Sequence, residues 1–133
     1  MSQKKAPPQV AVLGAGYWGQ NLVRDFYALG ALKVVYDPDE QVRARIGREY
    51  AGLEVTGDLR EVYRHEEVKA VAIASPAASH AAMALEALGL GRDVFVEKPL
   101  ALSLEDGELM VETAQRAGRV LMVDHLLNRH PAF

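Results

Sequence analysis

The chain has 133 residues, 50% of them hydrophobic and 25% charged, which is typical of a single globular domain. Fifteen Lys and Arg against eighteen Asp and Glu give a net charge of −3, so the composition indicates neither nucleic-acid binding nor electrostatic attachment to a membrane. The absence of cysteine excludes disulfides, iron–sulfur clusters, thiol catalysis and Cys-ligated zinc.

The N-terminal segment, residues 1–8, predicts a flexible polar tail. Lys4 and Lys5 precede an apolar stretch, but that stretch runs only over Val10–Leu13 before glycines interrupt it, which is too short for a signal peptide. The longest window of low charge, Ala70–Gly91, contains several polar residues and does not predict a membrane span. We therefore expect a cytoplasmic protein.

Short apolar runs alternate along the chain with stretches of helical period. The runs are Val10–Leu13, Leu32–Tyr36, Leu53–Val55, Ala70–Ala74, Val94–Val96 and Val120–Val123. Runs without a polar face predict strands of a parallel sheet that is covered on both sides. Apolar spacing predicts helices within 19–29 and 81–88, and Ser103 and Gly118 are suited to begin and end a third. This alternation predicts an α/β fold, a doubly wound parallel sheet of about six strands with helices on both faces.

The first predicted strand leads directly into a G-x-G-x-x-G pattern over residues 14–19. Between a strand and a helix, this pattern is the fingerprint of a dinucleotide-binding Rossmann fold. Gly14 permits the tight turn, Gly16 lets a pyrophosphate approach the backbone, and Gly19 lets the helix pack closely on the sheet. The alternative is a glycine turn in the same fold that binds no dinucleotide.

Two further features complete the predicted cofactor site. Tyr17 and Trp18 place backbone N–H groups at the positive end of the predicted helix, where they attract phosphate. Asp37 follows the second predicted strand, eighteen residues after Gly19, and its carboxylate would accept hydrogen bonds from the adenosine ribose. Because a carboxylate repels a 2′-phosphate, the sequence favours NAD over NADP.

Two more loops follow predicted strands and reach the same edge of the sheet. One is Ser75–His80, and the other is Glu97–Pro99. Loops at the carboxyl ends of parallel strands line the ligand crevice of such folds. The residues alone leave alternatives open: a helix cap with a packing histidine for the first loop, and an exposed charged pair for the second.

Together these motifs resemble the Gfo/Idh/MocA family, NAD(P)-dependent oxidoreductases that act on sugars and related polyols. The resemblance rests on the Gly-Tyr-Trp-Gly form of the glycine motif, on Ser75-Pro76 with the histidine that follows, and on Glu97-Lys98-Pro99. The closing segment Asp124–Pro131 is also similar to the family's segment after its sixth strand. The residues of this segment and of Gly16–Gly19 are most similar to those of members acting on nucleotide-linked amino sugars or their uronates.

The resemblance implies a role for each matching residue. The implied cofactor-binding residues are Gly14, Gly16, Tyr17, Trp18, Gly19, Asp37, Ser75, Pro76, His80, Glu97 and Lys98. Lys98 is also the implied catalytic residue, which assists proton transfer while a sugar or nucleotide-sugar hydroxyl is oxidised by hydride transfer to nicotinamide.

Family members continue into a second domain that forms the substrate pocket, completes the catalytic set and usually builds the oligomer interface. The resemblance covers one NAD(P)-binding Rossmann domain, residues 9–133, so we expect little turnover from this chain alone, and self-association into a homo-oligomer through its uncovered crevice. The alternative is a stand-alone nucleotide-binding or sensor module without catalysis. Lys98 favours the enzyme, because a sensor has no evident need for a lysine near the nicotinamide.

Two other kinds of site are weighed and rejected. Asp124, His125 and His130 do not have the spacing of a metal-ligand set, so no metal site is predicted. Arg43, Arg45 and Arg48 lie with Asp39, Glu40 and Glu49, which predicts a solvated helix face and not a nucleic-acid site.

Overall fold

A computed structural model describes residues 7–124, and residues 1–6 and 125–133 lie outside the described part. The strands are β1 (Gln9–Leu13), β2 (Leu32–Tyr36), β3 (Glu54–Thr56), β4 (Val68–Ile73), β5 (Asp93–Glu97) and β6 (Leu121–Asp124). The helices are α1 (Gly19–Ala28), α2 (Glu40–Glu49), α3 (Leu59–Arg64), α4 (His80–Gly89) and α5 (Leu104–Ala117), with a 3₁₀ turn at Ala77–Ser79 before α4. The predicted tail, and the histidines weighed as metal ligands, His125 and His130, fall largely or wholly outside the described residues.

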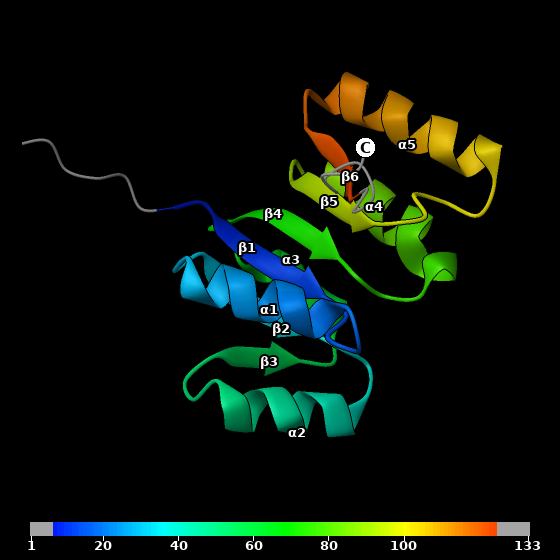
Figure 1. The fold of residues 1–133 in the computed structure, drawn as a ribbon. Coiled ribbons are helices and arrows are strands. Elements are labelled where there is room, and N and C mark those ends of the chain that lie inside the picture. The colour runs from blue at the N-terminus through cyan, green and yellow to red at the C-terminus, as the bar shows by residue number, and fades with distance from the viewer. Residues whose placement is uncertain (1–6, 125–133) are drawn as a thin grey trace, which may run out of the picture.

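The six strands form one parallel sheet in the order β3-β2-β1-β4-β5-β6. Figure 1 shows this sheet between helices on both sides. The winding direction reverses between β1 and β4, which are neighbours in the sheet. Loops leave the carboxyl ends of these two strands in opposite directions, and a ligand crevice opens between them. The prediction of a doubly wound Rossmann-type α/β fold is therefore confirmed.

Two apolar layers flank the sheet. The layer under α1 and α2 contains the buried side chains of Val10, Val12, Val23, Val35 and Ile46. The layer under α3, α4 and α5 contains those of Leu13, Val62, Ile73, Leu88 and Met110. Each fully buried side chain of this kind contributes about 1.5–3 kcal/mol relative to exposure. Strands buried on both faces explain why the runs lack polar alternation.

The helices agree with the sequence patterns except at one position. α5 begins and ends as predicted: the Ser103 hydroxyl accepts a hydrogen bond from the backbone N–H of Asp106, and Gly118 adopts a left-handed conformation with φ 64°. The pattern did not predict α3, because six residues are fewer than two turns and show no helical period. None of the described helices is long and apolar enough to cross a membrane.

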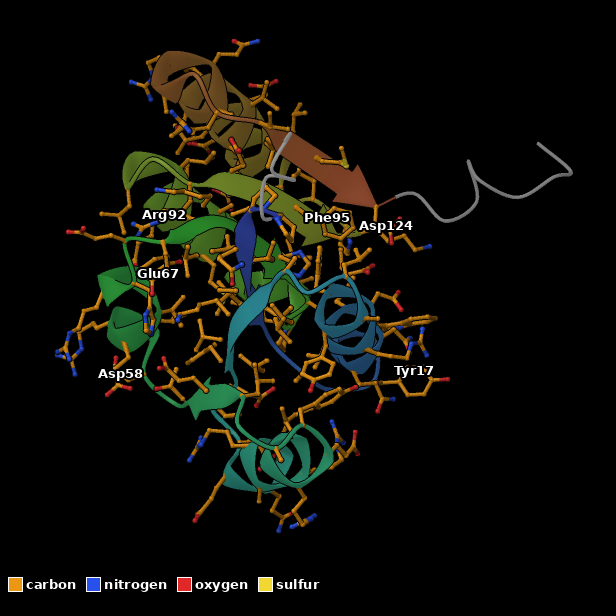
Figure 2. The ribbon with its side chains drawn as sticks, turned by 90° about the vertical axis from the view of Figure 1, so that its left-hand side faces the viewer. Tyr17, Asp58, Glu67, Arg92, Phe95 and Asp124 are labelled. Carbon is orange, nitrogen blue, oxygen red and sulfur yellow. The ribbon has the colours of Figure 1, made fainter. Side chains whose placement is uncertain are left out.

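A buried arginine joins several segments at the amino ends of the strands. The Arg92 guanidinium donates to the backbone carbonyl oxygens of Tyr63, His65, Val68 and Leu90 at 3.1–3.3 Å. Figure 2 shows Arg92 on the side of the sheet opposite to Asp124, which lies at the tip of β6. Hydrogen bonds from Arg92 thus join the segments at the amino ends of the strands, and the ligand crevice lies at their carboxyl ends.

Candidate functional site

The crevice at the carboxyl edge contains a hollow of about 800 Å³, a volume that suits a cofactor-sized ligand. Its walls include Gly14, Gly16, Tyr17, Trp18, Asp37, Asp39, Ser75, Pro76 and Ser79. A smaller hollow of about 140 Å³ is lined by residues that include Trp18, Ser75, His80, Glu97 and Lys98. Since Trp18 and Ser75 belong to both walls, the two hollows adjoin. Every predicted site residue lines one or the other except Gly19.

The glycine loop keeps its shape because side chains are missing at two positions. Gly14 has a φ of 98°, and a Cβ there would lie 2.7 Å from the backbone nitrogen of Ser75. A Cβ on Gly19 would lie 1.9 Å from the carbonyl oxygen of Gly14 and 3.3 Å from the Ala74 Cβ. Gly16 is different, because a Cβ there would meet no atom within 4 Å. Gly14 and Gly19 serve packing, whereas Gly16 faces open space.

The open space beside Gly16 fits a pyrophosphate. α1 begins at Gly19 and has no acidic residue in its first turn. Within the described part of the chain, the backbone N–H groups of Tyr17 and Trp18 donate to no protein acceptor. Unpartnered N–H groups at the positive end of a helix favour a bound anion. The residues present therefore fit the diphosphate of a dinucleotide.

Asp37 connects the glycine loop to the loop after β2. The backbone N–H of Ala15 donates to its Oδ2 at 2.9 Å, and the N–H of Asp39 donates to its Oδ1 at 2.8 Å. The residue is only 7% exposed, yet it lines the larger hollow. A carboxylate offers about four acceptor positions, so two remain for the hydroxyls of a ribose. Asp37 thus has a structural role besides the binding role that the sequence predicts.

Two arginines of α2 hold the same two loops, which the sequence did not predict. Arg45 donates from Nη2 to the carbonyl oxygen of Ala15 at 2.6 Å. Arg43 donates from Nη1 to the carbonyl oxygens of Asp37 and Pro38, both at 2.9 Å. The prediction of a solvated face is wrong for these two residues, because their long side chains reach across to loop backbone. The only sequence signal is their position on the helix that directly follows the Asp37 loop.

The loop after β4 is held by its serines. The Ser79 hydroxyl donates to the carbonyl oxygen of Pro76 at 2.8 Å, and its oxygen lies 2.7 Å from the Ser75 hydroxyl. Ser75 and Ser79 both line the larger hollow. Pro76 directly precedes the 3₁₀ turn and its carbonyl also accepts from the backbone N–H of Ser79. These bonds fix the wall that faces the glycine loop.

His80 is 1% exposed and belongs to the wall of the smaller hollow. Its Nδ1 lies 2.7 Å from the carbonyl oxygen of Pro99, and its Nε2 lies 2.7 Å from that of Ser75. Both ring nitrogens are therefore engaged by backbone, and neither is free to bond a cofactor. The burial of His80 agrees with the alternative that the sequence left open, a histidine that packs in the fold.

Two carboxyl groups lie together where β5 and β6 end. Glu97 pairs in register with Asp124, and side chains paired in this way on parallel strands lie on the same face. Burial raises the pKa of Glu97 and the neighbouring carboxyl of Asp124 raises it further, while His80 and Lys98 oppose the shift. Lys98 is exposed and lines the smaller hollow. The sequence analysis included Asp124 in the family-like closing segment and weighed it as a metal ligand, but it did not pair this residue with Glu97; its place at the end of the neighbouring strand was the missed signal.

The pKa of Glu97 leads to a prediction on stability. Because its pKa in the fold is raised above 4.5, the fold favours the protonated form; this contribution is fully present below about pH 4.5 and is lost as the pH rises through the raised value. Glu97→Gln should therefore melt at a higher temperature than the native chain at pH 7, with the difference vanishing near pH 4. Thermal melts by circular dichroism between these pH values test this. Glu108→Gln, on the exposed face of α5, is the control and should show no such trend.

A family model described as "Oxidoreductase family, NAD-binding Rossmann fold" (GFO_IDH_MocA) matches residues 9–125. The chain belongs to this family. The match confirms the resemblance drawn from the three motifs and the prediction of NAD as the cofactor of this domain. The preference for NAD over NADP stays a prediction.

Individual relatives agree with this assignment. A 2,7-anhydro-N-acetylneuraminate hydratase of Mediterraneibacter gnavus is 35% identical over 118 residues, which are 89% of this chain and 31% of that protein. A scyllo-inositol 2-dehydrogenase (NAD(+)) of Bacillus subtilis is 32% identical over 127 residues, 92% of this chain and 37% of that protein. The crystal structure of GenD2 from gentamicin A biosynthesis, in complex with NAD, is 31% identical with a TM-score of 0.81, covering 92% of this chain and 36% of GenD2. The chain thus spans about a third of the length of these relatives.

Proposed function

We propose that this chain is the cofactor domain of an oxidoreductase that oxidises a hydroxyl group of a sugar or nucleotide-sugar. The observation that supports the proposal is the adjoining pair of hollows, because Lys98 lines the smaller one and the larger one has the volume of a cofactor site. The scyllo-inositol dehydrogenase among the relatives supports a polyol or sugar hydroxyl as the reacting group. NAD, when bound, supplies a nicotinamide carbon that accepts a hydride.

The chain's own residues would then divide the work between binding and proton transfer. Gly16 and the N–H groups of Tyr17 and Trp18 bind the diphosphate, and Asp37 orients the adenosine ribose. Oxidation of a hydroxyl removes a hydride from carbon and a proton from oxygen, and the Nζ of Lys98 assists the transfer of that proton to solvent. Glu97 lies beside Lys98, lines the same hollow and offsets the charge of its ammonium group.

The domain organisation is part of the proposal. Since the relatives are about three times as long as this chain, we assign most of the substrate pocket and the oligomer interface to a second domain. Residues 9–133 would then bind the dinucleotide on their own but turn over little substrate. The stand-alone nucleotide-binding module stays the alternative.

Nucleotide titration tests the proposed function. Trp18 is the only tryptophan and lines both hollows, so its fluorescence reports on their occupancy. We expect saturable binding of both NADH and NADPH, with NADH at least about tenfold tighter, because Asp37 repels a 2′-phosphate. A folded chain that binds neither nucleotide would contradict the proposal and leave the glycine turn with a structural role alone.

The arginine contact to the glycine loop gives a second binding prediction. Arg45→Met removes the hydrogen bond to the Ala15 carbonyl while keeping most of the aliphatic side chain. We expect the Kd for NADH to rise about three- to tenfold, the effect of losing one hydrogen bond that orders the loop. Arg48→Met, on the same helix but exposed, is the matched control and should bind NADH as the native chain does. Equal Kd values for the two variants would exclude a role for Arg45.

A further inference from the structure

His80 lies between the two loops that carry the proposed chemistry. It is the first residue of α4, and its side chain is almost completely buried. One ring nitrogen contacts the backbone of Ser75, in the wall of the nucleotide hollow, and the other contacts the backbone of Pro99, directly after Lys98. A single ring therefore connects the nucleotide loop to the lysine loop.

The two carbonyl oxygens beside the ring of His80 determine its protonation state. Both oxygens accept hydrogen bonds and cannot donate them. A neutral imidazole has one N–H, so its second nitrogen would direct a lone pair at a carbonyl oxygen 2.7 Å away, an unfavourable contact in a buried position. An imidazolium donates from both nitrogens. Both distances are also in the range of charge-assisted N–H···O bonds.

The surroundings supply the counter-charge that a buried cation requires. Glu97 at the end of β5 is close enough to His80 for the ring's charge to lower its pKa, against the larger effects of burial and Asp124. Asp124 from β6 adds a second carboxyl group beside Glu97. Lys98, on the loop that His80 holds, is the other cation of this cluster in the described residues. The carboxyl pair faces two cations.

We propose that His80 is a positioning residue, an imidazolium clamp whose two N–H groups set the distance between the nucleotide loop and Lys98. It acts through the backbone of both loops and contacts no reacting atom. Loss of either ring proton releases one of the two loops. The clamp is a property of the free chain; only its consequence for Lys98 and the cofactor rests on the proposed function.

The protonation state is tested without any ligand. Long-range ¹H–¹⁵N correlation spectra of the ¹⁵N-histidine-labelled chain at pH 7 distinguish imidazolium from either neutral tautomer. The sequence has four histidines, so the His80 signals are assigned by replacing each of the other three in turn. We expect both His80 nitrogens to carry protons that exchange slowly with water. A neutral ring with a single N–H at pH 7 would overturn the proposal.

The effect on Lys98 is tested by two variants that each keep one arm of the clamp. The amide nitrogen of His80→Asn falls near the position of Nδ1 and retains the Pro99 arm, whereas that of His80→Gln falls near Nε2 and retains the Ser75 arm. Each variant is combined with Lys98→Met, and the Kd for NADH is measured. We expect Lys98→Met to raise the Kd for NADH by the same factor in the Asn variant as in the native chain. In the Gln variant, where the lysine loop is released, we expect this factor to be about three- to tenfold smaller. Equal coupling in both variants would overturn the proposed role in positioning.

These measurements separate the clamp from the proposed function. A native chain that binds no NADH contradicts the proposed function, while the spectrum of the free chain still decides the state of His80. Circular dichroism shows whether each variant folds. If one does not fold, the spectrum of the native chain alone decides for or against the clamp.

Discussion

Gly19→Ala should destabilise the chain by about 3 kcal/mol or more and abolish NADH binding. The added Cβ would lie 1.9 Å from the carbonyl oxygen of Gly14 and 2.7 Å from its carbonyl carbon, and neither backbone atom can move without displacing the glycine loop. Overpacking against backbone in a buried turn has costs of this size. Urea unfolding followed by circular dichroism gives the free energy, and Trp18 fluorescence gives the binding. A native-like midpoint would show that the helix and loop are less closely packed than described.

Gly16→Ala is the informative partner of this substitution. A Cβ at Gly16 meets no protein atom within 4 Å, so the variant should fold with nearly native stability. It should nevertheless bind NADH at least about tenfold more weakly, because the methyl group occupies the space where the diphosphate approaches. Gly47→Ala, in α2 and equally free of neighbours, should be more stable by about 0.5–1 kcal/mol and bind normally. Native binding by Gly16→Ala would place the diphosphate elsewhere.

Asp37 is the second position where we expect a large effect. Asp37→Ala leaves the N–H groups of Ala15 and Asp39 without an acceptor and should lower stability by about 2–3 kcal/mol, besides weakening NADH binding. Asp37→Asn keeps one acceptor oxygen and loses the charge. It should be more stable than Asp37→Ala and bind NADH about ten- to a hundredfold more weakly than the native chain. The Kd values for NADH and NADPH should also lie closer together than in the native chain. Parallel titrations with the two nucleotides measure both effects.

A second aspartate that accepts a hydrogen bond from the N–H two residues later, as Asp37 does, separates the effect on stability from the effect on nucleotide binding. Asp58 accepts a hydrogen bond from the backbone N–H of Arg60 at the start of α3 and lines neither hollow. Asp58→Ala should lower stability by about 1 kcal/mol and leave both nucleotide Kd values unchanged. If Asp37→Asn changed the Kd values for NADH and NADPH by the same factor, the Asp37 carboxylate would not discriminate between a hydroxyl and a phosphate at the 2′ position.

The fold could be predicted because its determinants are local. Valine-rich runs without polar alternation identify buried parallel strands, and the glycine motif identifies the first turn from strand to helix. β4 extends two residues further towards the N-terminus than the run at Ala70–Ala74 predicts, because Val68 pairs with Gln9 of β1. α3 was missed for the corresponding reason. Its single buried residue, Val62, shows its importance only once it packs under the sheet.

The sequence predicted most residues of the candidate site but not the hydrogen bonds between them. The sequence identifies Asp37 and His80, yet it does not show that one joins two loops through backbone N–H groups and the other through backbone carbonyls. Arg43 and Arg45 were missed altogether, since a pattern of charges cannot show which carbonyl a long side chain reaches. These contacts depend on the tertiary placement of segments up to thirty residues apart.

The loops around the crevice are held mainly through their backbone. Arg43, Arg45 and His80 all donate to carbonyl oxygens, and every amino acid provides such an oxygen whatever its side chain. An exposed residue such as Pro38 can therefore be exchanged without breaking the bond to its carbonyl oxygen that holds the loop in place. The scaffold separates loop placement from loop identity, so ligand preference can change through substitutions in the loops while the supporting side chains outside them stay the same.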